Sequence, residues 1–132
     1  MSTASYAEVV EGVRATIAAY TQALDDGRTE DVVATFRADG SCDIPGLGSH
    51  QGHEALHQAY AKWKPRRPQR HLVVNTLDTD WDDHEATASS DVVLLLKGKS
   101  GWAIQVVGCY RDTLRYENGT WQFRHRAAEF LD

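Results

Sequence analysis

The feature that most constrains this chain is a change of pattern at Arg70. Before it, residues 6–26 place apolar side chains three and four positions apart, as a helix with one buried face requires. After it come four segments rich in β-branched and aromatic residues, separated by turn residues that suit hairpins: residues 71–81, 85–96, 101–116 and 120–130. Helices followed by an antiparallel run of strands predict an α+β fold.

Three helices are predicted before the strands. Gly27 stands where a left-handed C-cap belongs, and Thr29 is placed to cap a second helix that runs to about Phe36. Residues 38–52 contain four glycines and a proline, which suits a short strand and a turn. Helical spacing resumes over residues 53–63 and stops at Pro65.

The third β segment predicts how the sheet faces its core. Its apolar side chains fall on alternate residues, and we expect one face to hold Trp102, Ile104, Val106, Tyr110, Leu114 and Tyr116. A strongly twisted sheet with a long helix across its concave side cannot fill its own hollow. We therefore expect a pocket between the helix and the sheet.

Size and charge limit the classes of function. A chain of 132 residues is long enough to bury one core, and we expect a single domain over residues 1–132. The formal net charge of −5 disfavours binding to nucleic acid or to an anionic membrane surface. The one basic cluster, at 62–70, is short and interrupted by two prolines, which suits a solvated loop or the rim of a pocket.

The sequence also bears on the cellular compartment. The first twenty residues form a helical pattern with charged side chains, so no secretory signal is predicted. No apolar run is long enough to span a membrane. The two cysteines, Cys42 and Cys109, lack the spacing of a disulfide framework or a zinc finger. These features favour a cytoplasmic protein.

A histidine at the entrance of the first long strand is the first candidate for chemistry. His71 follows a loop of prolines and arginines, whereas Tyr20 and Asp25 belong to the first helix and its end. On an ideal helix Asp25 lies about 140° around from Tyr20, so only a pocket that wraps around the helix end reaches both. Taken singly, each has a structural interpretation: an edge histidine, a core tyrosine and a solvated acid.

Several strings, in their order along the chain, resemble one protein family. They are AYTQALDDGRTEDVVATFRADGSCDIPGLGSHQG at 19–52, RHLVVN at 70–75 and GCYRDTLRYENGTWQFRHR at 108–126. Together they resemble the SnoaL-like branch of the NTF2-like superfamily over nearly the whole chain. The resemblance implies a cone, in which a curved antiparallel sheet and three N-terminal helices enclose an apolar pocket, and a homodimer formed through the sheet.

The resemblance also implies candidate site residues. The family includes polyketide cyclases, scytalone and bile-acid dehydratases and a dehydrochlorinase, together with proteins that only bind ligands. His71 and Asp25 match the histidine and aspartate that the dehydratases and the dehydrochlorinase pair. Tyr20 matches a tyrosine of the bile-acid dehydratase pattern, and Arg126 matches a pocket arginine of the dehydrochlorinase. We expect four aromatic side chains to contact the ligand: Trp63, Tyr110, Trp121 and Phe36.

These residues favour one type of chemistry. A neutral imidazole accepts a proton near neutral pH, and a carboxylate on its other ring nitrogen fixes its tautomer. We expect His71 to be the base, Asp25 to orient it, and Tyr20 or Arg126 to stabilise the negative charge that develops. The prediction is a cofactor-independent lyase or isomerase that dehydrates, isomerises or cyclises a small hydrophobic, cyclic or polyketide-like carbonyl compound.

Other functions remain open on sequence alone. The same fold serves as a non-catalytic binding or association module, in which the histidine is incidental. A base like that of ketosteroid isomerase is disfavoured, because Ile44 occupies its position and Asp43 should point to the opposite face. An arrangement like that of limonene epoxide hydrolase has only Arg111-Asp112 in its favour.

Metal binding is the remaining possibility. His53 and His57 are four residues apart and share one helix face, a spacing that can hold a metal. A working site requires a third ligand and residues that orient the ligands, and the neighbouring sequence offers neither clearly. We therefore predict neither a metal nor a cofactor.

Overall fold

The first helix has a defined start and end. The computed structural model describes residues 4–131, and α1 spans Tyr6–Asp25. The Ser5 side chain accepts a hydrogen bond from the Glu8 backbone and the Glu8 side chain accepts one from the Ser5 backbone, which forms a capping box. At the other end Gly27 has a φ of 72°, which confirms the predicted left-handed cap.

The two short helices differ in part from the prediction. α2 spans Thr29–Ala34 and α3 spans His53–Lys62. Thr29 is not the cap of α2, because Arg28 occupies the N-cap position and makes no side-chain capping bond. The Thr29 hydroxyl is instead buried in the protein. Phe36 is the first residue of a strand and not the end of α2.

Within residues 4–131, six strands form one sheet. In spatial order they are β2 (Gly48–Gln51), β1 (Phe36–Ile44), β6 (Thr120–Phe130), β5 (Gly101–Glu117), β4 (Glu85–Gly98) and β3 (Gln69–Trp81). All neighbours are antiparallel except β1 and β6, which run parallel. This parallel pair is possible because a long stretch of chain separates the two strands. Residues 38–52 were expected to form one short strand and a turn, but they contribute to two strands, β1 and β2.

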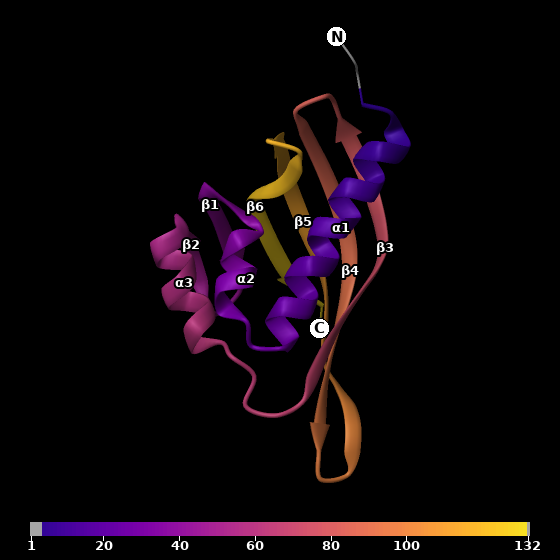
Figure 1. Ribbon diagram of the computed structural model, residues 1–132. Coiled ribbons are helices and arrows are strands. Elements are labelled where there is room, and N and C mark those ends of the chain that lie inside the picture. The colour runs from indigo at the N-terminus through magenta and orange to yellow at the C-terminus, as the bar shows by residue number, and fades with distance from the viewer. Residues whose placement is uncertain (1–3, 132) are drawn as a thin grey trace.

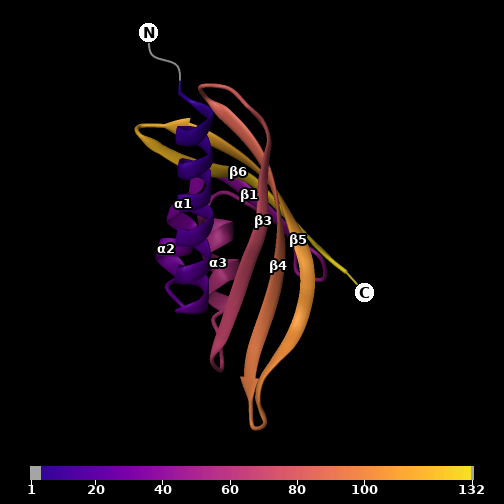
Figure 2. The ribbon, with the colours of Figure 1, turned by 90° about the vertical axis from the view of Figure 1, so that its right-hand side faces the viewer.

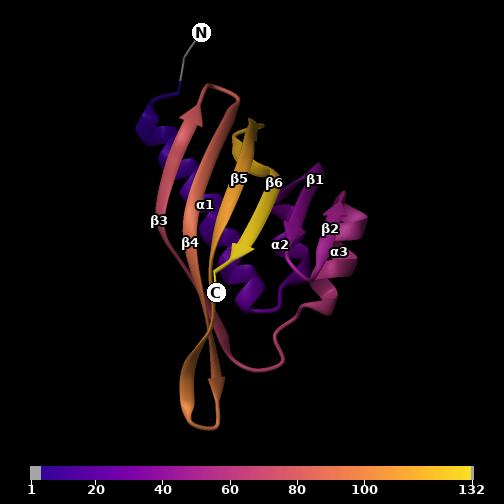
Figure 3. The ribbon, with the colours of Figure 1, turned by 180° about the vertical axis from the view of Figure 1, so that it is seen from behind.

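The elements form two layers. The three helices lie on one face of the curved sheet, with α1 running across it beside β3 (Figures 1 and 2). The β4–β5 hairpin extends well beyond the helices at one end of the molecule. No helix covers the opposite face of the sheet within residues 4–131 (Figure 3). Over the same residues, no helix has the length and apolar character needed to cross a membrane.

The core lies between α1 and the sheet. Val13, Ile17 and Tyr20 are buried, as the helical spacing predicts, and they pack with residues of the strands. Tyr20 meets the rings of Phe36 and Phe123 edge-on, with ring centroids 6.0 and 5.6 Å away. Aromatic packing thus fixes the middle of α1 against the sheet.

A β-bulge changes the face of the β5 side chains. Val106 pairs with Leu94, but Ile104 pairs with Leu95, so one extra residue lies between them on β5. The prediction that Trp102 and Ile104 share a face with Val106 and Tyr110 is therefore wrong. Both are exposed, and Ile104 is 66 % accessible to solvent.

Candidate active site

The structure brings His71 and Asp25 together. The imidazole Nδ1 of His71 lies 2.6 Å from Asp25 Oδ1, and the backbone N–H of His71 donates to Asp25 Oδ2 at 2.7 Å. The His71 and Asp25 side chains are only 14 % and 4 % exposed. The two residues are 46 positions apart in sequence, so the fold creates this pair.

The position of β3 at the edge of the sheet explains why the pair forms. On an edge strand, alternate backbone N–H groups point away from the neighbouring strand and have no ladder partner. Asp25, the last residue of α1, accepts such a bond from His71. Its Oδ1 also accepts a bond from Gln69 Nε2 at 3.1 Å. One carboxylate therefore fixes both the start of β3 and the imidazole ring.

This arrangement assigns the tautomer of His71. A carboxylate only accepts hydrogen bonds, so the nitrogen that faces it, Nδ1, carries the proton. In the neutral ring, Nε2 then holds the free lone pair. Nε2 has no hydrogen-bond partner among residues 4–131. The His71–Asp25 pair, which we call the dyad, can therefore accept one proton at Nε2 of His71.

His71 is part of the wall of an apolar cavity of about 200 Å³. This is somewhat larger than an engineered cavity of about 150 Å³ that binds benzene. The other residues in its wall are Tyr20, Leu24, Ile44, Leu47, Tyr60, Trp63, Gln69, Val92, Leu94, Val106, Tyr110, Ala128 and Phe130. The cavity is therefore suited to one or two small rings.

Two tyrosine hydroxyls meet in this wall. Tyr20 Oη and Tyr60 Oη are 2.6 Å apart, and both side chains are buried. Burial raises the pKa of both phenols well above the ordinary value, so both stay neutral. One hydroxyl donates to the other, which leaves one proton free to donate elsewhere. The helical spacing from Leu56 indicates that Tyr60 is buried, but its pairing with Tyr20 was not predicted.

Arg126 lies behind the cavity wall. Its side chain and that of Asp112 are 1 % and 0 % exposed, and Arg126 Nε lies 3.1 Å from Asp112 Oδ1. The contact is ionic and lacks the direction of a hydrogen bond. Burial raises the pKa of Asp112 to about 6, although the nearby Arg126 acts in the opposite direction.

The guanidinium group of Arg126 packs on tyrosine rings. Its Cζ atom lies 3.5 Å from the ring centre of Tyr110 and 4.3 Å from that of Tyr20. Arg126 is absent from the cavity wall, so the prediction that it touches the ligand directly is corrected. The reason is its pairing with Asp112, which holds it in the core. Its positive charge lowers the pKa of the Tyr20 and Tyr110 phenols, against the larger effect of their burial.

The four aromatic residues expected to contact the ligand divide into two pairs. Trp63 and Tyr110 lie in the cavity wall, whereas Phe36 and Trp121 do not. Phe36 is fully buried behind Tyr20 and Tyr60. The ring of Trp121 lies against Gly12 of α1, where a Cβ atom would collide with it. Phe36 and Trp121 are therefore corrected to core residues.

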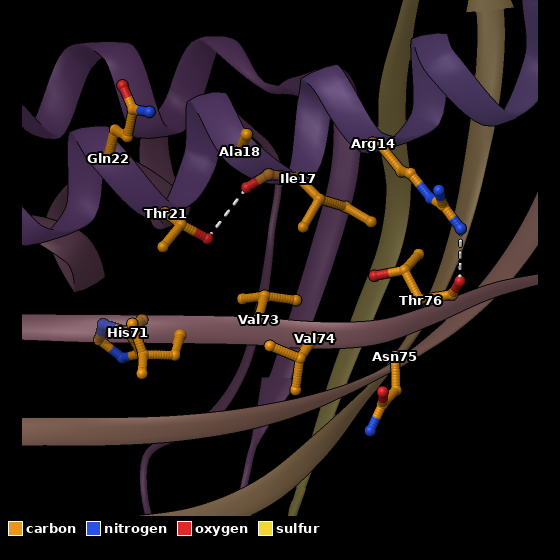
Figure 4. Close-up of a pocket in the computed structure, with 11 residues that line it drawn as sticks. Arg14, Ile17, Ala18, Thr21, Gln22, His71, Val73, Val74, Asn75 and Thr76 are labelled. Carbon is orange, nitrogen blue, oxygen red and sulfur yellow. Dashed lines mark hydrogen bonds between the residues drawn. The ribbon is translucent and has the colours of Figure 1, made fainter.

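A second, open groove reaches His71 from the other side. It has a volume of about 650 Å³ and runs between α1 and β3 (Figure 4). Arg14 spans it by donating from Nη2 to the Thr76 carbonyl at 2.8 Å. Since His71 belongs to the walls of both hollows, this residue separates the apolar cavity from the groove.

The residues of the isomerase and epoxide hydrolase alternatives are not arranged for catalysis. Ile44 lines the cavity and Asp43 is exposed on the other face, as predicted. Arg111 is exposed and nearest to Glu129, whereas Asp112 points into the core. Strand alternation therefore separates the two residues of the Arg111-Asp112 pair.

The histidines of α3 do not form a metal site. His53 Nε2 lies 2.8 Å from the Phe36 carbonyl oxygen, so His53 holds α3 against β1. Among the described residues 4–131, no three His, Cys, Asp or Glu side chains lie close enough to hold a metal ion.

Comparisons with known proteins identify the family of this chain. Residues 5–127 match the model of the SnoaL-like domain family. A search of curated proteins gave no match. Among solved structures, the Mycobacterium tuberculosis protein Rv3472(D26N), of unknown function, is 24 % identical with a TM-score of 0.86, covering 93 % of this chain and 72 % of its own.

Two other solved structures share the fold. A scytalone dehydratase-like protein of Novosphingobium aromaticivorans is 20 % identical with a TM-score of 0.83, covering 94 % of this chain and 85 % of its own. A Catenulispora acidiphila protein in complex with S-DNPA is 23 % identical with a TM-score of 0.84, and 94 % of each chain is covered. At these identities the structures show the fold alone. The family model and the fold agree, and the chain belongs to the SnoaL-like family, with an NTF2-like fold.

Proposed function

We propose that this SnoaL-like protein is a cofactor-independent enzyme that abstracts a proton from a small hydrophobic cyclic carbonyl compound. One observation carries the proposal: a carboxylate holds an imidazole so that its ring borders an apolar cavity. A base of this kind contributes about 10² to 10⁴ in rate. The fold alone would not support this conclusion, because the same fold has many functions.

The proton transfer is assigned to His71. Nε2 accepts a proton from the carbon next to the carbonyl group of the substrate. The electron pair of the C–H bond becomes a C=C bond, and the carbonyl oxygen becomes an enolate oxygen. Asp25 stabilises the resulting imidazolium through the hydrogen bond to Nδ1, in the role of the acid in a catalytic triad.

The enolate oxygen needs a hydrogen-bond donor in the same cavity. The Tyr20–Tyr60 pair supplies one free proton, and both phenols remain neutral because burial raises the pKa of each. Tyr110 carries a further hydroxyl, and the Arg126 guanidinium packs on its ring. A well-placed donor is worth about 10² to 10³ in rate. Arg126 then acts through the tyrosines as a positioning residue.

The enolate has two outcomes that this site supports. A hydroxyl group on the neighbouring carbon leaves as water after accepting a proton from the imidazolium or a tyrosine, which completes a dehydration. Alternatively, the proton returns to a different carbon, which completes an isomerisation. The open groove on the far side of His71 gives its ring access to water for proton exchange. The likeness to a scytalone dehydratase-like protein supports the first outcome.

Turnover of a compound panel tests this function. Wild-type protein is incubated with ring-sized β-hydroxyketones, and the conjugated enone product is followed by its ultraviolet absorbance. We expect conversion of at least one compound and at least 100-fold slower conversion by His71→Gln, since the base is lost. His125→Gln is the matched control, because His125 contacts Ser41 and lies outside the cavity wall.

Two results would contradict the proposal. Equal turnover by wild type and His71→Gln would exclude the histidine as the base. If wild type converts none of the compounds but binds them, the protein is a binding module.

We also propose a homodimer through the sheet, on the face that no helix of residues 4–131 covers. Alternation places a row of exposed apolar side chains on this face, opposite to the residues of the cavity wall. They are Leu72, Val74, Trp102, Ile104 and Val107. A patch of this kind is unusual on a monomer unless a partner covers it.

A further inference from the structure

The positive charges of this acidic protein are unevenly placed. Seven of the 14 Lys and Arg residues lie in two short segments, five at 62–70 and two at 97–99. Neither segment contains an acidic residue. None of the seven forms an ion pair with a carboxylate of residues 4–131, whereas other arginines do, such as Arg28, Arg37 and Arg124.

The two basic segments lie together in space. The Lys97 backbone N–H donates to the Pro68 carbonyl at 3.0 Å. Gly98 faces the guanidinium of Arg67, which would lie 3.8 Å from a Cβ atom at that position. The loop before β3 and the tip of the β4–β5 hairpin lie at the same end of the molecule (Figures 1 and 2). We call Arg66, Arg67 and Lys99 the basic rim; all three are exposed.

The loop that carries Arg66 and Arg67 lies next to the cavity. Trp63 and Gln69 both belong to the cavity wall, so the loop between them, with Arg66 and Arg67, edges the cavity. On the hairpin side the wall includes Leu94, and the hairpin tip with Lys99 follows it along the chain. Lys97 pairs with Trp102 and therefore lies on the opposite face of the sheet. The deep end lies at the buried Tyr20 and Tyr60, and the exposed wall residues are Leu47 and Phe130.

The cavity and the basic rim recognise different chemistry. The wall is mainly apolar, and about 200 Å³ holds only a ring-sized group. The wall contains no Lys or Arg, so a negative group on the ligand has no such partner inside. Next to the wall, three cations without acidic partners among residues 4–131 attract a negative group, while the net charge of −5 repels it from the rest of the surface.

We infer that the ligand of this cavity is an amphipathic anion: a ring-sized apolar part that enters the cavity, joined to an oxyanion tail, a carboxylate or phosphate, that the basic rim binds. The inference deepens the proposed function by naming the class of substrate, and it rests on that function only in using the same cavity. It also accounts for the basic residues at 62–70, which the catalytic proposal leaves unused.

A pair of fluorescent probes tests the inference without the natural substrate. 8-Anilinonaphthalene-1-sulfonate and N-phenyl-1-naphthylamine share their ring system, but only the first carries an anionic group. One exposed ion pair is worth about 0.2–1 kcal/mol, so two or three contacts predict about tenfold tighter binding of the sulfonate dye. In 1 M NaCl, where the Debye length is about 3 Å, this preference should disappear.

Matched variants assign the preference to the basic rim. The rim variant combines Arg66→Gln, Arg67→Gln and Lys99→Gln. The control variant combines Arg28→Gln, Arg111→Gln and Arg124→Gln, and removes the same charge from other surfaces. We expect equal affinity for the two dyes in the rim variant and a retained preference in the control. An equal affinity in wild type, or a preference that survives in the rim variant or is lost in the control, overturns the inference.

Blocking the cavity tests whether one ligand spans both parts. Ala128→Trp places a large side chain in the cavity wall, and it should weaken the binding of both dyes at least tenfold. Unchanged binding of the sulfonate dye would mean that the basic rim binds anions independently, which contradicts the inference. Because these readouts are binding and not turnover, they stand whether or not His71 proves to be a base.

Competition separates the two sources of the oxyanion. Octyl phosphate, octanoate and octanol share an eight-carbon chain and differ in charge. Displacement of the sulfonate dye by octyl phosphate at lower concentration than octanoate would assign a phosphate tail, and the reverse order would assign a carboxylate tail. If neither anion displaces the dye better than octanol does, the inference is wrong.

Discussion

Replacing Asp25 with asparagine should reverse the tautomer of His71. The asparagine side chain would have one oxygen and one NH2 group where Asp25 has two acceptors. The backbone N–H of His71 donates to Asp25 and cannot become an acceptor. The oxygen should therefore face the backbone, and the NH2 group should face the ring and Gln69, whose amide then turns its oxygen toward it. The imidazole then accepts at Nδ1 and carries its proton on Nε2.

The magnitude follows from the bonds that change. Three hydrogen bonds to a carboxylate become bonds to a neutral amide. Bonds to charged groups are worth about 1.5–3 kcal/mol and neutral ones about 0.5–1.5, and some of the difference returns because no charge is buried. We expect a loss of about 1–3 kcal/mol in the free energy of unfolding. The rate of any turnover should fall about 10²- to 10⁴-fold, but less than in His71→Ala.

The tautomer can be observed directly by NMR. Long-range ¹H–¹⁵N correlation spectra of protein labelled in its six histidines show which nitrogen of each ring is protonated. The His71 signal is assigned by its absence in His71→Gln. Asp26→Asn is the matched control, because Asp26 is the next residue, is exposed and pairs with Arg28. A proton that stays on Nδ1 in Asp25→Asn, or sits on Nε2 in wild type, would refute the reasoning.

Three further predictions concern the buried groups and the surface. Burial raises the pKa of Asp112 from 3.8 to about 6, so this residue contributes its full stability below pH 3.8 and loses it as the pH rises through 6. Urea unfolding should show wild type losing about 3 kcal/mol relative to Asp112→Asn across this range; parallel profiles would contradict it. A double-mutant cycle of Tyr20→Phe and Tyr60→Phe should give a coupling energy of about 1 kcal/mol, and additive losses would exclude the hydrogen bond. Light scattering should find a dimer that Ile104→Glu makes monomeric and Ala7→Glu, on the exposed side of α1, does not; a wild-type monomer would refute the dimer.

The order of the elements could be predicted from the sequence because periodicity and turn residues act locally. The buried stripe of α1 and the left-handed Gly27 follow from spacing and from glycine chemistry. The parallel pairing of β1 with β6 could not be predicted, because nothing in either strand specifies a partner so distant in sequence. Periodicity also failed at Gln105, where a bulge without a residue signature moved Trp102 and Ile104 to the exposed face.

The dyad was easier to predict than the rest of the site. Family resemblance matched His71 and Asp25, and the helix end and the strand start are both visible in the sequence. The position of Arg126 was harder to predict. Its burial depends on Asp112, which faces it on the neighbouring strand β5, and on a bulge in β6 at Arg124. Strand alternation from the buried Tyr110 and Leu114 predicts that Asp112 is buried as well, whereas the sequence alone does not predict the burial of Arg126.

The most direct test of the central claim is hydrogen exchange into a ketone. In deuterated buffer, a base at the cavity should replace the protons next to the carbonyl group of 1-tetralone, whose two fused rings suit the size of the cavity. ¹H NMR measures this rate without knowledge of the natural product. The dyad predicts exchange above the buffer rate in wild type, and a loss of about 100-fold or more of this excess in His71→Gln. Exchange that is equally fast in both proteins, or no faster than in buffer, would contradict it.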